Sequence, residues 1–222
     1  MFHSDATQWV GRMPTDVRAP DGVSSDDGAF RGDVLTFAPH KFHGPAGVGV
    51  VWCRGGVRLV PTTPGAQELG RRGGTENAPG IVGSGVAAEL AGAWLADPEE
   101  RARGARLRDR LERSVVDAVP GTRINGCAEE GRRMWNTSSL SIPGVEGEAL
   151  VMALSERGVC VSTGAACSSG SAEPSAVLLA MGLGAARAGS SIRVSLSRET
   201  SGIEVDEAAR AIGACWLAAA DA

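Results

Sequence analysis

Residues 36–49 read TFAPHKFHGPAGVG and contain Lys41, the only lysine among 22 basic residues. An arginine guanidinium stays protonated and cannot form an imine, whereas a lysine amine can lose its proton and attack a carbonyl. Apolar runs at residues 34–37 and 47–52 predict a strand on each side of this lysine. Lys41 is therefore expected on a loop at a strand end, where open α/β sheets bind ligands. Either it forms an imine, which indicates pyridoxal phosphate, or it is a surface lysine that survives by chance in an arginine-rich sequence.

The composition is that of a globular protein. The 222 residues are 43% hydrophobic and 22% charged, which is enough to bury one large or two small cores. A net charge of -4 without a long basic run argues against a nucleic-acid partner. No apolar run is long enough to cross a bilayer, and no signal peptide is evident. We therefore expect a cytoplasmic protein with no membrane partner.

The cysteines predict free thiols, one of them reactive. There are five, without C-x-x-C spacing, so we expect neither disulfides nor a metal site. Cys167 lies in residues 162–171, STGAACSSGS, a stretch of small residues that predicts an accessible loop. Three other thiols lie on apolar strand or helix positions and are expected to be inert core residues: Cys53, Cys160 and Cys215.

Two polar stretches of the first 80 residues are candidates for ligand contacts. Asp5 and Gln8 follow what we interpret as the end of a buried strand, and a carboxylate there could serve a cationic ring nitrogen. An N-cap of the following turn is an equally good interpretation of Asp5. Residues 71–80, RRGGTENAPG, form a glycine-rich turn that offers N–H groups and the Thr75 hydroxyl to an anion, a plain loop being the alternative.

Two helices are predicted next. Apolar residues recur every fourth position in the first, which ends near Asp97: Val82, Val86, Leu90 and Trp94. Pro98 opens the second helix, which runs to about residue 119 with its arginines on a solvated face. Its apolar side carries Leu107, Leu111 and Val115.

The last third alternates strands and helices, which predicts a small α/β domain. Strands are expected at residues 138–142, 159–161 and 191–196, and helices at residues 146–157 and 205–216. The last strand carries Arg193. Its guanidinium could bind a carboxylate with two parallel hydrogen bonds, although a surface strand arginine is the plainer alternative.

Four motifs together resemble one family. They are residues 3–11 (HSDATQWVG), 40–49 (HKFHGPAGVG), 72–79 (RGGTENAP) and 162–174, the last followed by SIRVS. In this order they are similar to the C-terminal part of the group I (NifS/IscS-like) cysteine desulfurases, which are class V aminotransferase relatives. The sequence ACSSG around Cys167 is of the group I kind.

The resemblance implies an α/β protein of the pyridoxal-phosphate-dependent transferase fold type I. Residues 1–97 would be the C-terminal part of the large cofactor-binding domain, and residues 98–222 the small C-terminal domain with the cysteine loop. Family members carry a further N-terminal part, so we expect an incomplete large-domain sheet and a partial site.

The resemblance also implies roles toward pyridoxal 5'-phosphate. Lys41 would hold the cofactor covalently and move the substrate Cα proton. Asp5 would pair with the ring nitrogen, Gln8 would hydrogen-bond the phenolic oxygen, and His40 would touch the phosphate. Thr75 would reach the phosphate of the neighbouring protomer's cofactor, which implies a homodimer.

For the substrate, the resemblance implies that Arg193 binds the carboxylate of L-cysteine. Cys167 would take the sulfur as a persulfide, release L-alanine and pass the sulfur to an acceptor protein such as an iron-sulfur scaffold. One departure is Ala38, where the family commonly has a serine whose hydroxyl contacts phosphate. A selenocysteine lyase and a non-catalytic remnant are the alternatives.

Overall fold

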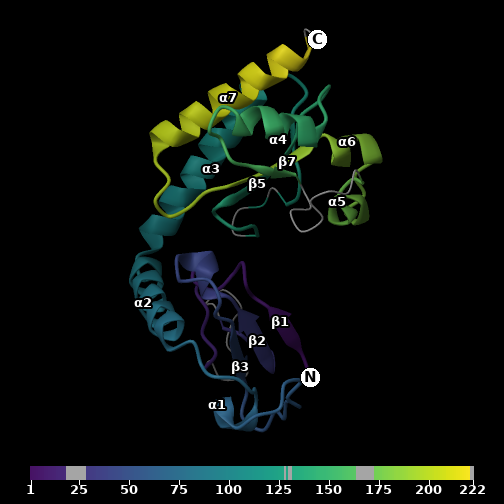
Figure 1. Ribbon diagram of the computed structural model, residues 1–222. Helices are drawn as coiled ribbons and strands as arrows, with labels where there is room; N and C mark the ends of the chain where they lie inside the picture. Colours follow the sequence, from purple (N-terminus) through teal and green to yellow (C-terminus); the bar gives the residue numbers. More distant parts are fainter. Residues whose placement is uncertain (19–28, 128, 130–131, 164–172, 221–222) are drawn as a thin grey trace. The chain divides into compact units, whose positions relative to one another are not determined.

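The protein is represented by a computed structural model that divides into two compact units, Met1–Pro98 (unit 1) and Glu99–Ala222 (unit 2), which we describe separately (Figure 1). The described residues are 1–18, 29–127, 129, 132–163 and 173–220. Among them, no helix has the length and apolar character needed to span a membrane. The assignment of residues 1–97 and 98–222 to a large and a small domain stays a prediction.

Unit 1 contains a three-stranded sheet in the order β1-β2-β3. Its strands are β1 (His3–Asp5), β2 (Val34–Phe37) and β3 (Val50–Cys53). β1 runs parallel to β2, with Asp5 opposite Thr36, and β3 is antiparallel to β2. The prediction for residues 34–37 is confirmed, and the second predicted strand begins later, at Val50. The prediction of a buried first strand is wrong, because both end residues of β1 are exposed.

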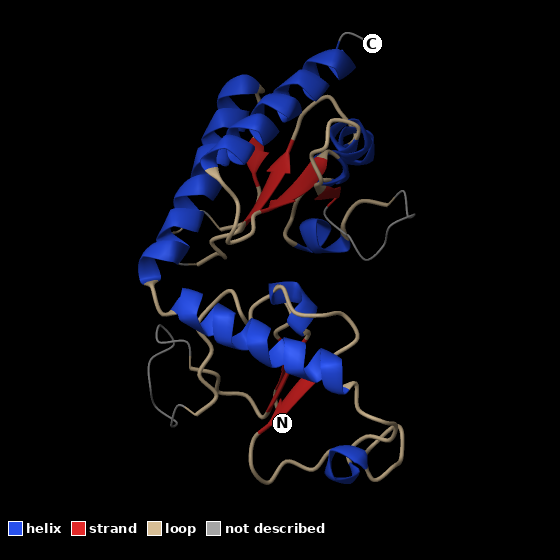
Figure 2. Cartoon of the chain, turned by 60° about the vertical axis from the view of Figure 1, so that its left-hand side comes forward, coloured by secondary structure: helices blue, strands red, loops and turns tan. Residues whose placement is uncertain are grey.

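The helical elements of unit 1 are η2 (Pro39–Phe42), the short α1 (Gln67–Gly70) and α2 (Ala78–Leu95). Figure 2 shows α2 beside η2 and the sheet. The buried residues of α2 are small: Gly80, Ser84, Ala87 and Ala91. Of the four apolar residues predicted to recur every fourth position, Val82, Val86 and Leu90 are more than half exposed, and Trp94 is half-buried. α2 is thus apolar on both sides, and its small residues form the packed one.

Unit 2 contains a four-stranded antiparallel sheet in the order β4-β5-β7-β6. Its strands are β4 (Arg123–Ile124), β5 (Thr137–Ser141), β6 (Ser162–Thr163) and β7 (Ser191–Ser195). Its helices are α3 (Pro98–Ala118), α4 (Gly147–Ser155), α5 (Ala176–Ala180), α6 (Ala185–Gly189) and α7 (Gly202–Ala220). One core joins α3, α4 and α7 to β5 and β7 (Figures 1 and 2).

The core of unit 2 tests several sequence predictions. Leu111 and Val115 of α3 are fully buried in it, so the predicted apolar face of this helix is confirmed. The solvated arginine face is only partly right, because Arg108 is 7% exposed and bonds Asp109 and the Met134 carbonyl. The strand predicted at residues 159–161 is wrong. β6 begins at Ser162, and Cys160 is an exposed thiol.

Candidate active site

Asp5 lies at the carboxyl end of β1 and is held as an anion. The backbone N–H of Thr7 donates to Asp5 Oδ1 at 3.0 Å. Hydrogen bonds from the side chain and the backbone of Thr7 lower the pKa of Asp5, and the charge of nearby His3 lowers it further. A carboxylate with a lowered pKa is therefore fixed at the end of an exposed strand.

The turn after β1 carries Gln8 and packs against the segment that carries Lys41. The N–H of buried Ala6 donates to the Thr36 carbonyl at 2.8 Å, which extends the pairing of β1 and β2 by one residue. Gly11 has a φ of +78°, and a Cβ there would lie 2.4 Å from Phe42 Cγ. Phe42 directly follows Lys41, so only a glycine at position 11 permits this close approach.

Lys41 lies in η2, which follows β2 directly. Its N–H donates to the Ala38 carbonyl at 3.0 Å, and Ala38 supplies no side-chain cap. Phe42 is 3% exposed and forms a small cluster with α2, while Lys41 is half-buried and His40 is exposed. Within the described part of the chain, the Lys41 amine has no hydrogen-bond or ion-pair partner. Its amine is therefore not engaged by another side chain there.

The parallel pairing of β1 and β2 brings two of the predicted site residues to the same edge of the sheet. Asp5 ends β1, and Lys41 follows β2 by four residues. Carboxyl ends of adjacent parallel strands face the same way, so both residues lie at the edge where open α/β sheets bind ligands. This is the arrangement that the sequence predicted for Lys41.

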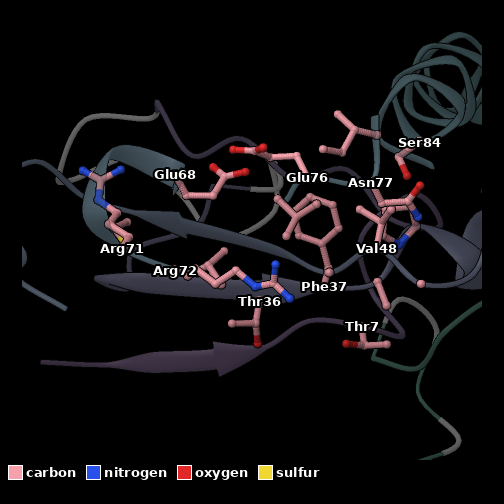
Figure 3. A pocket seen from close by; sticks show the side chains of 18 of the residues that line it. Thr7, Thr36, Phe37, Val48, Glu68, Arg71, Arg72, Glu76, Asn77 and Ser84 are labelled. Atoms are coloured by element: carbon pink, nitrogen blue, oxygen red, sulfur yellow. The ribbon is translucent and has the colours of Figure 1, made fainter. Parts of the chain in front are cut away.

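A pocket of about 970 Å³ opens beside this edge (Figure 3). Asp5 and Thr36 line it from the sheet, and Arg72 and Thr75 line it from the loop before α2. Figure 3 shows the side chains of Arg72 and Glu76 reaching in from that loop. Lys41 lies between two lining residues of η2, whereas Gln8, His40 and Lys41 itself are not part of the lining. Of these predicted residues, the structure thus places Asp5 and Thr75 in the pocket lining and leaves the other three out of it.

Arg193 belongs to unit 2 and lies in the middle of β7. Its neighbours Ile192 and Val194 point into the core, so Arg193 alternates to the other face of the sheet and is half-buried. It pairs in register with Ser139 of β5 and Ser162 of β6. The sequence that contains Cys167 begins just after β6, and Cys167 lies outside the described residues.

One contact of the candidate site, that of Arg12 with Gln8, was not predicted from the sequence. The hold of Thr7 on Asp5 is of the capping kind that was the alternative interpretation of Asp5, because the N–H two residues later donates to the carboxylate. Arg12 Nη1 donates to the Gln8 carbonyl at 3.1 Å and also to Gln8 Oε1. Signals for both existed, since Asp-x-Thr suits an Asx turn and the Gln-Arg pair has i,i+4 spacing.

Comparison with known proteins gives consistent matches. The model of the family described as "Aminotransferase class-V" matches residues 1–207. "Cysteine desulfurase 2" of Trichormus variabilis is 44% identical over 208 residues, which are 93% of this chain and 48% of that protein. "Cysteine desulfurase NifS" of Azotobacter vinelandii is 39% identical over 96% of this chain and 50% of its own length.

Solved structures agree with these sequence matches. A "NIFS-LIKE PROTEIN" has a TM-score of 0.79 and 34% identity, over 96% of this chain and 51% of that one. A NifS-like protein from Rickettsia africae has a TM-score of 0.75 and 27% identity, over 100% of this chain and 54% of that one. The fold is therefore the α/β fold of NifS-like, pyridoxal-phosphate-dependent fold type I structures over about half their length. The chain likewise spans about half the length of the curated relatives it matches.

Proposed function

This chain belongs to the class-V aminotransferases, in their NifS-like cysteine desulfurase branch, and we propose from this that it takes part in cysteine desulfuration. The reaction removes sulfur from L-cysteine, gives L-alanine and leaves a persulfide on the protein. The observation that carries the proposal is the position of Asp5 and Lys41 at the ends of adjacent parallel strands. The family supports this reading, since it depends on pyridoxal phosphate.

The residues at this edge fit that cofactor. A pyridinium nitrogen needs an anion, and Asp5 is kept ionised by its contacts with Thr7. An aldehyde needs an amine, and Lys41 is the only lysine in the sequence. Gln8 and His40, which lie on the neighbouring turn and in η2, offer donors to the phenolic oxygen and the phosphate. When bound, the cofactor supplies an electron sink for the carbon next to the substrate amine.

The residues of the chain then have distinct roles. Asp5 binds and orients the ring through its nitrogen, and Lys41 holds the cofactor and later moves the proton at the substrate Cα. Arg193 binds the substrate carboxylate with its two parallel N–H donors, which orients the amino acid. Ser139 and Ser162 lie opposite Arg193 in the two neighbouring strands.

Cys167 accepts the sulfur in this proposal. Its thiolate attacks the sulfur of the substrate, an S–S bond forms, and the C–S bond breaks with its electron pair going to the substrate Cβ. Cβ then takes up a proton, and alanine leaves. We further propose a homodimer in which Thr75 reaches the neighbouring protomer's cofactor, and transfer of the sulfur to an acceptor protein such as an iron-sulfur scaffold in the cytoplasm.

Cofactor binding is tested by incubating the chain with pyridoxal phosphate. We expect visible absorbance, and after borohydride reduction the added mass should be found on the peptide that contains Lys41. Lys41→Ala should show neither, because the sequence has no second lysine. Added mass on Lys41→Ala after reduction would overturn the assignment, because the imine would then form on another amine.

Desulfuration is tested by alanine and sulfide release. Cys167→Ser should keep the cofactor and lose nearly all release, because a serine hydroxyl is not an anionic nucleophile at neutral pH. The matched control is Cys160→Ser, which changes an exposed thiol with no proposed role. A preference for L-selenocysteine over L-cysteine would favour the selenocysteine lyase alternative. Unchanged release from Cys167→Ser would remove the persulfide from this residue.

A further inference from the structure

Contacts at both ends hold the backbone of the turn that carries Gln8. These contacts do not fix the orientation of the Gln8 side chain. At one end the N–H groups of Trp9 and Val10 both donate to the Ala6 carbonyl at 2.9 Å. At the other end, Gly11 lies against the ring of Phe42. The backbone around Gln8 is thereby fixed relative to the Lys41 segment, although the Gln8 side chain itself is exposed.

Arg12 makes the contact that holds the Gln8 side chain. It is half-buried, and burial lowers the pKa of its guanidinium, which nevertheless stays protonated in proteins. Nη1 of Arg12 donates both to the backbone carbonyl and to the side-chain Oε1 of Gln8. An arginine side chain has five N–H donors and no acceptor, so it can bind only the oxygen end of an amide.

Because Arg12 can only donate hydrogen bonds, it determines which end of the Gln8 amide faces it. With Oε1 turned toward Arg12, the NH₂ group is the end left for another partner, and NH₂ can only donate. A donor stabilises the anionic form of the oxygen that it reaches. Gln8 is therefore suited to an acceptor such as a phenolate, and unsuited to a hydroxyl that must itself donate.

We propose that Arg12 is a positioning residue that fixes the Gln8 amide with its NH₂ presented as a donor to the ring oxygen of the cofactor. The proposal rests on the function proposed above for its last step, the contact with the cofactor. Its first step, the hold of Arg12 on Gln8, concerns the chain alone and is tested without cofactor.

The first test uses the side-chain amides of the free chain. The sequence contains only two glutamines, Gln8 and Gln67, so selective ¹⁵N-glutamine labelling gives two assignable NH₂ pairs. Gln8→Ala identifies the Gln8 pair. Arg12→Met should move this pair toward the shift and mobility of a free side chain and leave the Gln67 pair in place, which also reports that the chain remains folded. If the NH₂ signals of Gln8 do not change in Arg12→Met, the proposal is overturned.

Arg12→Lys provides a conservative variant in case Met at this position unfolds the turn. Lysine keeps the charge and one donor group but loses the planar fork. We expect an intermediate Gln8 shift, between those of the parent and of Arg12→Met. The Gln8 NH₂ signals could instead shift equally in Arg12→Lys and Arg12→Met, or shift in neither. Either result would contradict the proposal that Arg12 holds Gln8 by donating to Oε1.

The second test measures the pH at which the visible absorbance of the bound cofactor titrates. Losing the donor to the phenolic oxygen should raise this midpoint in Gln8→Ala and in Arg12→Met, each by about one pH unit. In the Gln8→Ala background, Arg12→Met should add no further shift if Arg12 acts through Gln8. A full additional shift would show that Arg12 acts by its own charge and would overturn the proposal. Absence of Lys41-dependent absorbance in the parent would instead refute the proposed function, and the amide test then decides the hold of Arg12 on Gln8 separately.

Discussion

Unit 2 and unit 1 bury their side chains in different ways. In unit 2, three helices and two strands share one core, in which Leu140, Ile142 and Ile192 are completely buried. In the described part of unit 1, a small buried cluster joins Phe42 to two alanines of α2. The residues proposed to act on the cofactor lie in unit 1, where hydrogen bonds within turns hold them. Unit 2 is thus stabilised mainly by its core, and the candidate site of unit 1 mainly by local contacts.

The two long helices show the same contrast. α3 is amphipathic and turns Leu111 and Val115 into the core. α2 has a single charged residue, Glu89, and exposes Val82 and Val86 on the side away from its packed small residues. A helix that is apolar all round is usually buried in a larger structure. α2 therefore presents an apolar side that unit 1 does not bury.

The largest expected effect is in unit 2, at the ion pair of Arg133 and Glu112. Arg133 donates to both Glu112 oxygens, at 2.8 and 2.7 Å, and the Glu112 side chain is 4% exposed. Arg133→Met would leave a buried carboxylate without its partner, which costs about 3–5 kcal/mol. Urea denaturation measures the loss of unfolding free energy, and hydrogen exchange of the β5 amides measures the loss within unit 2.

The neighbouring arginine provides the control for that experiment. Arg132 pairs with Glu129, and both side chains are about 70% exposed, so Arg132→Met should change the free energy of unfolding by less than about 1 kcal/mol. Equal losses from both variants would show that burial does not separate the two pairs, and the contrast between core and turn contacts would fail.

The next effect is in unit 1, at Gly11. Gly11→Ala would force a Cβ against Phe42 and place a side chain at positive φ, so we expect a loss of about 2–3 kcal/mol. Gly49→Ala is the control, because a Cβ there meets nothing within 4 Å. Hydrogen exchange of the β2 amides measures the loss, and weaker cofactor binding should accompany it. Stability unaffected by Gly11→Ala would mean that the turn and the Lys41 segment are not coupled.

The sequence could predict those parts of the fold that depend on local pattern. The strand at residues 34–37 and the packed face of α3 follow directly from apolar periodicity. Periodicity shows which residues are apolar and not which side is covered, so the apolar stripe predicted the helix α2 but could not show that Val82, Val86 and Leu90 are exposed. Cys160 was predicted to lie in a strand because its neighbours are apolar. It lies instead in the segment that connects α4 to β6, and its thiol is exposed.

The candidate site was predictable where a residue's chemistry is rare. The only lysine of the sequence, at a strand end, is an evident candidate for imine formation. Asp5 lies at the same edge of the sheet because β1 and β2 are parallel. The contact of Arg12 with Gln8 was not predicted, and a cap of the turn by Asp5 was only one of two interpretations, because residue pairs at i,i+4 and i,i+2 are common in any sequence. Only the folded turn shows that these two pairs are used.

A smaller effect is expected on the exposed side of α2. Val82 and Val86 are 68% and 51% exposed, so changing both to glutamine removes apolar surface that unit 1 does not bury. The free energy of unfolding of the monomeric chain should change by less than about 0.5 kcal/mol per site. A matched change in α3, Val115→Gln, would place an amide in the core and should cost several times more. A large loss in the α2 variant, seen by denaturation at low protein concentration, would mean that this side is covered.

The smallest effect concerns how a turn controls charge, and it compares one carboxylate from each unit. Hydrogen bonds from Thr7 lower the pKa of Asp5, and hydrogen bonds from Ser201 lower that of Glu204 at the start of α7. A folded pKa below the unfolded one gives a stability contribution that is present above the unfolded pKa and is lost as the pH falls through the folded pKa. Thr7→Val removes the hydroxyl and keeps the backbone donor, so it should raise the pKa of Asp5 part of the way and leave that of Glu204 unchanged. Carboxyl ¹³C titration by NMR measures both groups in one sample. If the pKa of Asp5 does not move, its charge does not depend on the Thr7 hydroxyl; if both pKa values move, the effect is not local to the turn.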